Sequence, residues 1–455
     1  MSDALADATR ERARFQSELF DFLRIPSVSA KSDHDADTRR AATWLAENMR
    51  RCSLAVEILE TPKHPVVIGE WRGAGPKAPT VLIYGHYDVQ PPEPLDEWSS
   101  PPFEPTVRDG NIYARGSADD KGQLFMHVKA LEAALADGGT LPINVVVLAE
   151  GEEEIGSPSL VPFVETHKDR LAADVFVISD SNMFDKGMPS LLFSLRGLSY
   201  LEIKVRGAKT DLHSGGYGGA VGNPATALAR IIASFHDADG HVAIDGFYDD
   251  VVDWDAKTRA QIKSLPFSDE DFRTGLDVKQ LVGEKGFSTL ERLWIRPTCE
   301  VNGLLSGYTG EGAKTVLPAK AMAKVSFRLV PDQNPARVRQ LVEAHLKKVT
   351  PPGVTVELEE HHGGMPWKAE IGGKWFEAAS TALEEAFGTR PVLAGEGGSI
   401  PIVVEFERIL GATALMIGYA LPGNNAHAPD EWFPIENFEK GITSLVRLYQ
   451  LLGSA

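Results

Sequence analysis

A histidine and an aspartate at the end of an apolar run are the first residues that could bind a metal. The segment TVLIYGHYDV, residues 80–89, is expected to form a strand. His86 and Asp88 would then project from the same face at its carboxyl end, where open α/β sheets place their ligands. A ligating histidine needs its second ring nitrogen held by a hydrogen bond, often to a carboxylate, which Asp88 can supply. Taken alone, the pair also fits an ordinary surface histidine.

A pair of aspartates lies in the motif RGSADDKG, just before apolar residues at helical spacing. Asp119 and Asp120 are therefore expected at a helix start. Acidic side chains are favoured there by the unpaired N–H groups and the helix dipole, which would explain one of them. Two aspartates in succession, downstream of a strand that ends in His, favour metal binding at least as strongly as they favour a purely structural role at the helix start.

Four glutamates follow a second apolar run. Residues 143–149 read as a buried parallel strand, and the glutamates come directly after it: Glu150, Glu152, Glu153 and Glu154. So many carboxylates at one strand end repel one another unless a cation lies among them. The alternative, an acidic solvated loop, would account for one or two of the four.

Two further candidates complete a ligand set. Asp180 ends the apolar strand ADVFVISD, and His427 lies in the loop NNAHAPDEW after the apolar run 414–418. Strands that end in His, Asp or Glu supply ligands for a pair of borderline or hard divalent ions. Imidazole and carboxylate ligands without cysteine are typical of a catalytic zinc, manganese or cobalt site, where water becomes nucleophilic at neutral pH.

These motifs resemble those of the M20 metallopeptidases, and within them the cytosolic nonspecific dipeptidase and carnosinase branch. The matching segments cover nearly the whole chain in the family's order: GHYDV, ARGSADDKG, EGEEEIGS, VISD, DLHSGG, GAKTVLP, FRLVPDQ, GGSIP and NAHAPDE. The resemblance implies metal-dependent hydrolysis of dipeptides or short peptides with a free C-terminal carboxylate. It also implies two divalent metal ions per subunit, with zinc expected and manganese or cobalt as alternatives.

The resemblance assigns roles at the metal centre. It implies five ligands: His86, Asp119, Glu154, Asp180 and His427. Asp119 would bridge both ions and Asp88 would orient His86. Glu153 would be the general base. Because three glutamates are adjacent, a register shifted by one residue, with Glu152 as the base, stays open.

Further roles concern the substrate. Arg328 lies on the polar face of an alternating strand, and the resemblance implies that it binds the substrate carboxylate, a task that suits a bidentate guanidinium. The alternative is a solvated sheet surface. Ser399 reads as an N-cap before Pro401, and N–H groups at such a helix start can hold an anion. Gly398 of GGSIP and Thr315 of GAKTVLP are expected to contact substrate as well.

His213 of DLHSGG resembles the family histidine that reaches into the active site of the partner subunit. The resemblance therefore implies a homodimer. A loop histidine among glycines would not suggest this role by itself.

The chain of 455 residues is long enough for more than one domain. Strands alternate with helical patterns up to Asp180, which predicts an α/β domain with a mainly parallel sheet. From about Leu198 the strands alternate apolar and polar residues, which is typical of a half-exposed sheet. We therefore predict a catalytic domain in two parts, 1–197 and 366–455, and an inserted α+β lid and dimerisation domain at 198–365.

Composition narrows the function. A formal net charge of −18 argues against nucleic-acid or membrane-surface partners. Cys52 and Cys299 are too few for a disulfide framework, which favours a cytoplasmic location.

Three other functions remain to be weighed. An N-acyl amino acid deacylase of the same superfamily would share the metal ligands. A two-metal phosphohydrolase would be expected to add basic phosphate-binding residues, and the motifs contain few Lys or Arg. A non-catalytic metal-binding scaffold would need neither Glu153 nor Asp88.

Overall fold

The computed structural model describes residues 2–398 and 400–454. The chain forms two compact units. Unit 1 comprises Met1–Phe193, Ala369–Ala394 and Glu405–Ala455, and unit 2 comprises Ser194–Lys368 and Gly395–Val404. Unit 2 thus takes in a short segment, Gly395–Val404, that the sequence reading had assigned to the second part of the catalytic domain. The domain bounds 1–197, 198–365 and 366–455 stay a prediction.

Unit 1 is built on a sheet with a parallel centre. Its central strands pair in the order β6-β3-β7-β17, all parallel, while β2 and β1 continue antiparallel beyond β6, and β8 lies antiparallel beside β17. The strands are β1 (Ala55–Leu59), β2 (Val66–Trp71), β3 (Thr80–His86), β6 (Asn144–Glu150), β7 (Val175–Ile178), β8 (Ser190–Leu195), β16 (Val392–Glu396) and β17 (Thr413–Gly418). Every residue of β6 is buried, as its continuous apolar run predicts.

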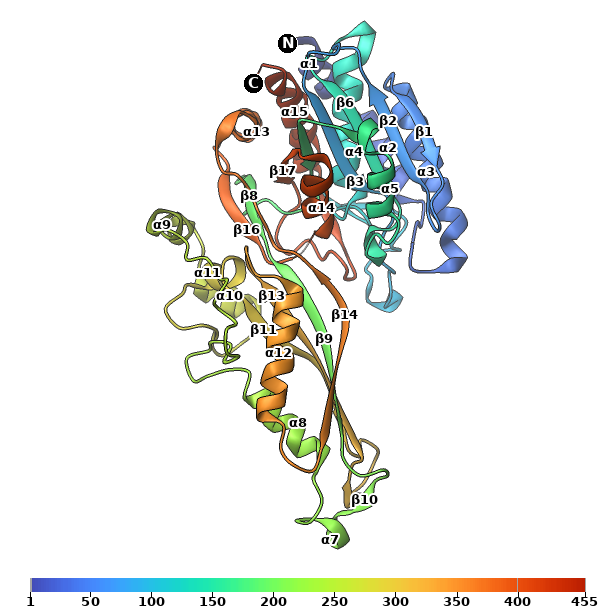
Figure 1. The fold of residues 1–455 in the computed structure, drawn as a ribbon. Coiled ribbons are helices and arrows are strands. Elements are labelled where there is room, and N and C mark those ends of the chain that lie inside the picture. The colour runs from blue at the N-terminus through green and yellow to red at the C-terminus, as the bar shows by residue number, and fades with distance from the viewer. Residues whose placement is uncertain (1, 399, 455) are drawn as a thin grey trace. The chain divides into compact units, whose positions relative to one another are not determined.

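Helices cover both faces of this sheet (Figure 1). On one face, Ile83 and Val177 join the core formed with α4 and α15. On the other, the ring of Phe406 from α14 meets Tyr84 and Phe176 edge to face. The helices are α1 (Ser2–Arg10), α2 (Arg12–Leu23), α3 (Asp35–Arg51), α4 (Lys121–Leu135), α5 (Leu160–Thr166), α6 (Lys168–Leu171), α13 (Gly373–Phe387), α14 (Pro401–Leu410) and α15 (Ile435–Leu452).

A small three-stranded sheet joins two distant segments of unit 1. Strands β4 (Thr106–Arg108) and β5 (Asn111–Tyr113) form a hairpin, and β18 (Trp432–Pro434) pairs with β5. Asp109 and Gly110 at the hairpin turn have positive φ angles of 49° and 78°, which is the backbone conformation that Asp-Gly pairs favour in tight hairpin turns. This sheet brings the end of the His427 loop beside the segment that leads to Asp119.

Unit 2 is an α+β unit. Its four antiparallel strands run in the order β11-β13-β9-β14, and α8 and α12 pack on one face (Figure 1). Val325, Phe327 and Leu329 are fully buried in that core, so Arg328 projects from the opposite face. The elements are β9 (Gly197–Arg206), β10 (Leu212–His213), α7 (Ser214–Tyr217), α8 (Pro224–Ala233), α9 (Ala256–Ser264), α10 (Asp269–Gly275), α11 (Thr289–Trp294), β11 (Thr298–Ser306), β12 (Val316–Leu317), β13 (Lys320–Leu329), α12 (Pro335–Val349), β14 (Thr355–Gly364) and β15 (Trp367–Lys368).

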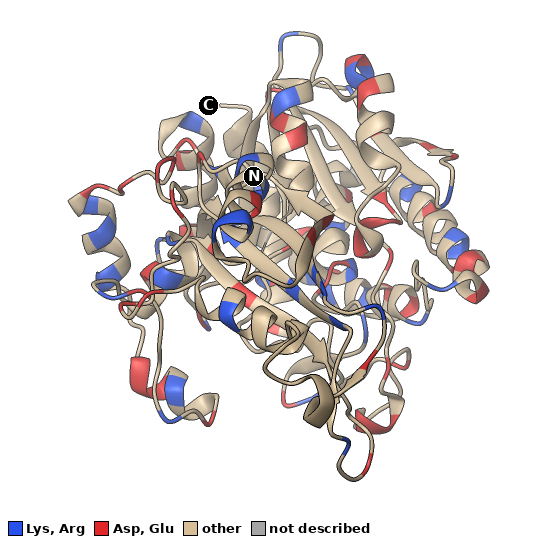
Figure 2. Cartoon of the chain, turned by 60° about the horizontal axis from the view of Figure 1, so that its bottom comes forward, with Lys and Arg blue, Asp and Glu red and all other residues tan. Residues whose placement is uncertain are grey.

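The charged side chains are interspersed on the helices. Figure 2 shows Lys and Arg positions and Asp and Glu positions spread over the same helices, and some of these residues are paired within one helix, as Arg408 is with Glu405. Among the described helices, none is both long and apolar enough to cross a membrane.

Candidate metal centre

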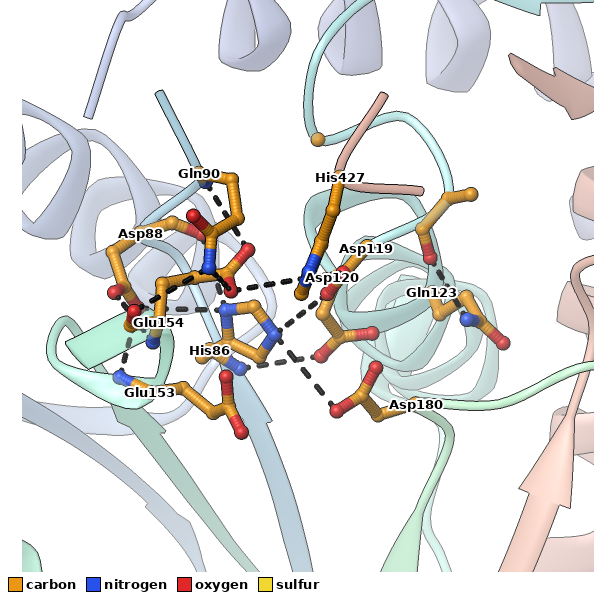
Figure 3. A network of polar contacts seen from close by, with 12 residues as sticks. His86, Asp88, Gln90, Asp119, Asp120, Gln123, Glu153, Glu154, Asp180 and His427 are labelled. Atoms are coloured by element: carbon orange, nitrogen blue, oxygen red, sulfur yellow. Dashed lines mark hydrogen bonds and ion pairs between the residues drawn. The ribbon is translucent and has the colours of Figure 1, made fainter. Parts of the chain in front are cut away.

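Acidic and imidazole side chains converge at the carboxyl ends of three neighbouring strands in unit 1 (Figure 3). His86 is the last residue of β3, Asp180 follows β7, and Glu153 and Glu154 lie in a single 3-10 turn after β6. Asp119 lies just before α4, and His427 lies in the loop between β17 and β18. Because β6, β3 and β7 are adjacent and parallel, residues far apart in sequence meet at one sheet edge.

The five predicted ligands form two groups that share Asp119. The first group consists of His86, Asp119 and Asp180. The second consists of Asp119, Glu154 and His427. In each group the ligand atoms lie within 4.8 Å of one another. One oxygen of Asp119 lies 3.1 Å from Nε2 of His86, and the other lies 2.9 Å from Nε2 of His427. Nε2 of His427 is also 3.2 Å from Glu154, and Nε2 of His86 is 3.9 Å from Asp180. The structure therefore brings together the atoms that two bridged cations would need.

The electrostatics of this cluster also fit bound cations. Burial, followed by the charge of Asp119, raises the pKa of Asp180 to about 7, and the same two causes raise the pKa of Glu154. Hydrogen bonds to Asp119 and Glu154 raise the pKa of His427 to about 10. These buried carboxylates repel one another and need positive charge nearby. Imidazole nitrogens and carboxylate oxygens are donors that borderline divalent ions accept.

Asp88 is completely buried, and it contacts both His86 and the turn that carries Glu153 and Glu154. Nδ1 of His86 lies 3.1 Å from the backbone carbonyl of Asp88 and 3.4 Å from its carboxylate, so that Nε2 is left to face the ligand group. The carboxylate accepts hydrogen bonds from the backbone N–H groups of Glu153, at 3.3 Å, and Glu154, at 3.1 Å. Asp88 thus orients the glutamate turn as well as His86.

The three adjacent glutamates have different surroundings. Glu152 is buried and accepts hydrogen bonds from the backbone of His64, at 2.9 Å, and Ser159, at 3.0 Å, and from the hydroxyl of Thr61, at 2.8 Å. Its carboxylate is therefore held by the surrounding loops. The Glu153 carboxylate instead lies beside His86 and Asp180 (Figure 3), and burial raises its pKa well above the usual value.

One contact at the centre was not anticipated from the sequence. Gln90 donates hydrogen bonds to both oxygens of Glu154, from its backbone N–H at 3.1 Å and from its side-chain amide at 2.8 Å. Its position directly after the segment TVLIYGHYDV, two residues after Asp88, was the available signal. Gln90 fixes the orientation of one predicted ligand.

The remaining predicted residues belong to unit 2. His213 is exposed, and its Nδ1 accepts hydrogen bonds from the backbone N–H groups of Gly215, at 3.0 Å, and Gly216, at 3.2 Å. A neutral His213 ring must therefore carry its proton on Nε2, which is free to donate. Thr315 lies next to it, because its carbonyl accepts a hydrogen bond from Ser214 at 3.0 Å.

Arg328 has a second arginine beside it in unit 2. Burial, together with the charge of Arg328, lowers the pKa of Arg196 to about 10, and burial also lowers the pKa of Arg328. Nε of Arg196 donates to the carbonyl of Gly397 at 3.3 Å, and the N–H of Gly398 donates to Glu396 at 3.3 Å. Arg196 was missed by sequence reasoning, although it directly precedes the alternating strand β9. Ser399 lies outside the described residues.

Residues 82–451 match the family model described as "Peptidase family M20/M25/M40". The chain belongs to this peptidase family. It is 31% identical to the Cys-Gly metallodipeptidase dug1 of Schizosaccharomyces pombe, over 95% of this chain and 94% of that protein. It is 30% identical to the human Beta-Ala-His dipeptidase, over 96% of this chain and 85% of that protein.

Among solved structures, the chain resembles an M20 family metallo-carboxypeptidase, Sso-CP2, from Sulfolobus solfataricus. The TM-score is 0.86 at 34% identity, over 97% of this chain and 99% of that one. The comparisons confirm the predictions of an M20 peptidase, of an α/β fold with a largely parallel sheet, and of a metal-dependent dipeptidase.

Proposed function

We propose that this chain hydrolyses the peptide bond of dipeptides or short peptides that have a free C-terminal carboxylate. The observation that carries the proposal is the pair of ligand groups that share Asp119, with the Glu153 carboxylate beside them. The full-length similarity to a Cys-Gly metallodipeptidase and a Beta-Ala-His dipeptidase supports dipeptides as substrates.

Two divalent metal ions would be held in unit 1. His86, Asp119 and Asp180 would hold one, and Asp119, Glu154 and His427 would hold the other. Zinc suits this mixture of nitrogen and oxygen donors, and manganese and cobalt are accepted by the same donors. When bound, such ions polarise the scissile carbonyl and lower the pKa of the attacking water.

Glu153 is the proton carrier of the proposed reaction. Its carboxylate takes a proton from the attacking water and delivers it to the nitrogen of the leaving amine, so that the peptide bond breaks to give a neutral amine and a carboxylic acid, which releases its proton to water. Burial raises the pKa of Glu153, which makes it a stronger base than an exposed glutamate. The hydrogen bond from its backbone to Asp88 fixes the turn that carries it.

Residues of unit 2 would recognise the substrate. Arg328 binds the terminal carboxylate through its guanidinium, and Gly398, Ser399 and Thr315 contribute further polar contacts. His213 donates from Nε2 to the oxyanion that forms in the active site of the partner subunit. The active form is accordingly a homodimer, and the low cysteine content is in keeping with a cytoplasmic enzyme.

The proposal is tested by loading the metal-free protein with zinc, manganese or cobalt in turn and measuring hydrolysis of a panel of dipeptides beside N-acyl amino acids. We expect at least one metal to give faster turnover of dipeptides. Preferential cleavage of the N-acyl amino acids would replace the proposal with a deacylase function. No hydrolysis of either class with any of the three metals would refute both.

A further inference from the structure

A buried carboxylate attaches the loop that carries His427 to the segment that carries Asp119. Glu431 is completely buried and follows His427 by four residues. One of its oxygens accepts hydrogen bonds from the backbone N–H groups of Ala118, at 2.8 Å, and Asp119, at 3.1 Å. The other accepts from the backbone of Gly116 at 2.9 Å. Glu431 therefore binds the backbone of the residue that both ligand groups share.

Arg115, which belongs to the segment of Asp119, contacts the loop of His427 in turn. It is 1% exposed, and its guanidinium donates to the second oxygen of Glu431 at 2.7 Å. The same guanidinium donates to the carbonyl of Ala428 at 3.2 Å, directly after His427. The segment of Asp119 and the loop of His427 thus hold each other by contacts in both directions.

We propose that Glu431 is a positioning residue of the metal centre, with Arg115 as its counter-charge. The proposal rests on the proposed ligand roles of Asp119 and His427. Glu431 sets the distance between these two residues, and hence the geometry of the group formed by Asp119, Glu154 and His427. This group depends most on it, because the Glu431 contacts orient both Asp119 and His427.

The burial of the pair argues for this role over plain fold stabilisation. Taking a carboxylate and a guanidinium out of water is energetically costly, so a buried pair adds little net stability compared with an apolar replacement. What the pair does provide is directional bonding, because four donors converge on the two oxygens of Glu431. The neighbouring Asp430 attaches the same loop to Ser99 and Arg108 without contacting the Asp119 segment.

The test measures metal binding without activity. Metal-free wild-type protein and variants are titrated with Co²⁺, and both the heat of binding and the visible Co²⁺ absorption spectrum are recorded. Glu431→Gln places an amide NH₂ against N–H donors, and Glu431→Asp retracts the carboxylate by one methylene. We expect one of the two Co²⁺ sites to lose affinity by about 10- to 100-fold in both variants, with a changed spectrum.

Glu132→Gln is the matched control. It also removes a charge from a partly buried ion pair of unit 1, that of Glu132 with Lys129, and Glu132 contacts no predicted ligand. We expect its thermal stability to fall while Co²⁺ affinity and spectrum stay as in the wild type. If Glu431→Gln does not fold, Glu431→Asp and Arg115→Lys decide the question by the same criterion.

The outcomes separate this inference from the proposed function. Two wild-type-like Co²⁺ sites in folded Glu431 variants would overturn the positioning role and leave the dipeptidase proposal intact. Failure of the wild-type protein to bind two Co²⁺ ions would instead overturn the proposed metal centre, and the positioning role with it.

Discussion

The carboxylate of Asp88 accepts a hydrogen bond from the backbone N–H of Glu153 at 3.3 Å. The same carboxylate lies 3.4 Å from Nδ1 of His86, so that one buried side chain orients a predicted ligand and the predicted base. Substitutions at these positions therefore give the most direct tests of the centre.

Glu153→Gln should lower turnover by about 100-fold or more, because the amide cannot accept the proton of the attacking water. It should retain its metal, since Glu153 lies in neither ligand group. Glu152→Gln should instead lower thermal stability, because the Glu152 carboxylate accepts hydrogen bonds from Thr61, His64 and Ser159. Steady-state kinetics, metal analysis and thermal unfolding of both variants measure this. An inactive Glu152→Gln beside an active Glu153→Gln would show that the register is shifted by one residue.

Asp88→Asn should weaken metal binding or activity by about 10- to 100-fold, because it loses the charge that holds His86 and the glutamate turn. Asp174→Asn is a matched control. Asp174 also accepts a backbone hydrogen bond, from Thr80 at 2.8 Å, but at the opposite end of β3. Metal titration and kcat/KM should separate the two variants, and equal effects would contradict a specific role for Asp88.

Amidation of the C-terminus of a good dipeptide substrate should reduce productive binding by roughly 2 to 5 kcal/mol, because a charged partner of Arg328 would be lost. Arg328→Ala should reduce kcat/KM for the free dipeptide and should have little effect on the amide. Measurement of kcat/KM for the wild type and for Arg328→Ala, each with the free and the amidated dipeptide, tests whether Arg328 and the terminal carboxylate act on each other. Equal rates of the wild-type enzyme on the free and amidated dipeptides would contradict carboxylate recognition.

A mixture of His213→Ala and Glu153→Gln chains should regain activity that neither has alone. In a heterodimer, one active site combines an intact Glu153 with an intact His213 from the partner chain. Loss of one oxyanion donor typically costs about 100- to 1,000-fold, so the recovered signal is readily measured. Subunit exchange is verified by differently tagged chains. Exchange without recovered activity, or a fully active monomer in sedimentation, would contradict a shared site.

The buried His127 should make unit 1 sensitive to acid. Its ring lies 2.7 Å from the hydroxyl of Tyr449 and 2.8 Å from that of Ser179, and burial lowers its pKa from 6.5 to about 3. Between these values the unfolded chain binds a proton that the folded chain does not, so stability present above pH 6.5 is lost as the pH falls. The maximal slope for one proton is about 1.4 kcal/mol per pH unit.

His127→Gln should therefore lose less stability than the wild type when the pH is lowered from about 7.5 to about 5.5, by roughly 1 to 2 kcal/mol. Urea unfolding at both pH values measures the difference. His236→Gln, at an exposed histidine of unit 2, should show the wild-type response. The same acid sensitivity in the wild type and His127→Gln would exclude His127 as its source.

The sequence by itself determined the features that local patterns encode. Apolar runs predicted the strands that end at His86 and before Asp180, and helical spacing predicted the helix that begins after Asp120. Alternation predicted that Arg328 lies on the face of β13 opposite Val325, Phe327 and Leu329. These predictions hold because strand and helix periodicity depend on residues that are neighbours in the chain.

Only the tertiary structure decided which glutamates face the centre and what holds the ligands. Glu152 is turned away by contacts with Thr61 and His64, and Glu431 meets Asp119 across 312 positions of sequence. The packing of Gly395–Val404 with unit 2 is likewise a long-range result. Such contacts depend on how strands from distant segments are ordered in space, and the local pattern of apolar and polar residues carries no information about that order.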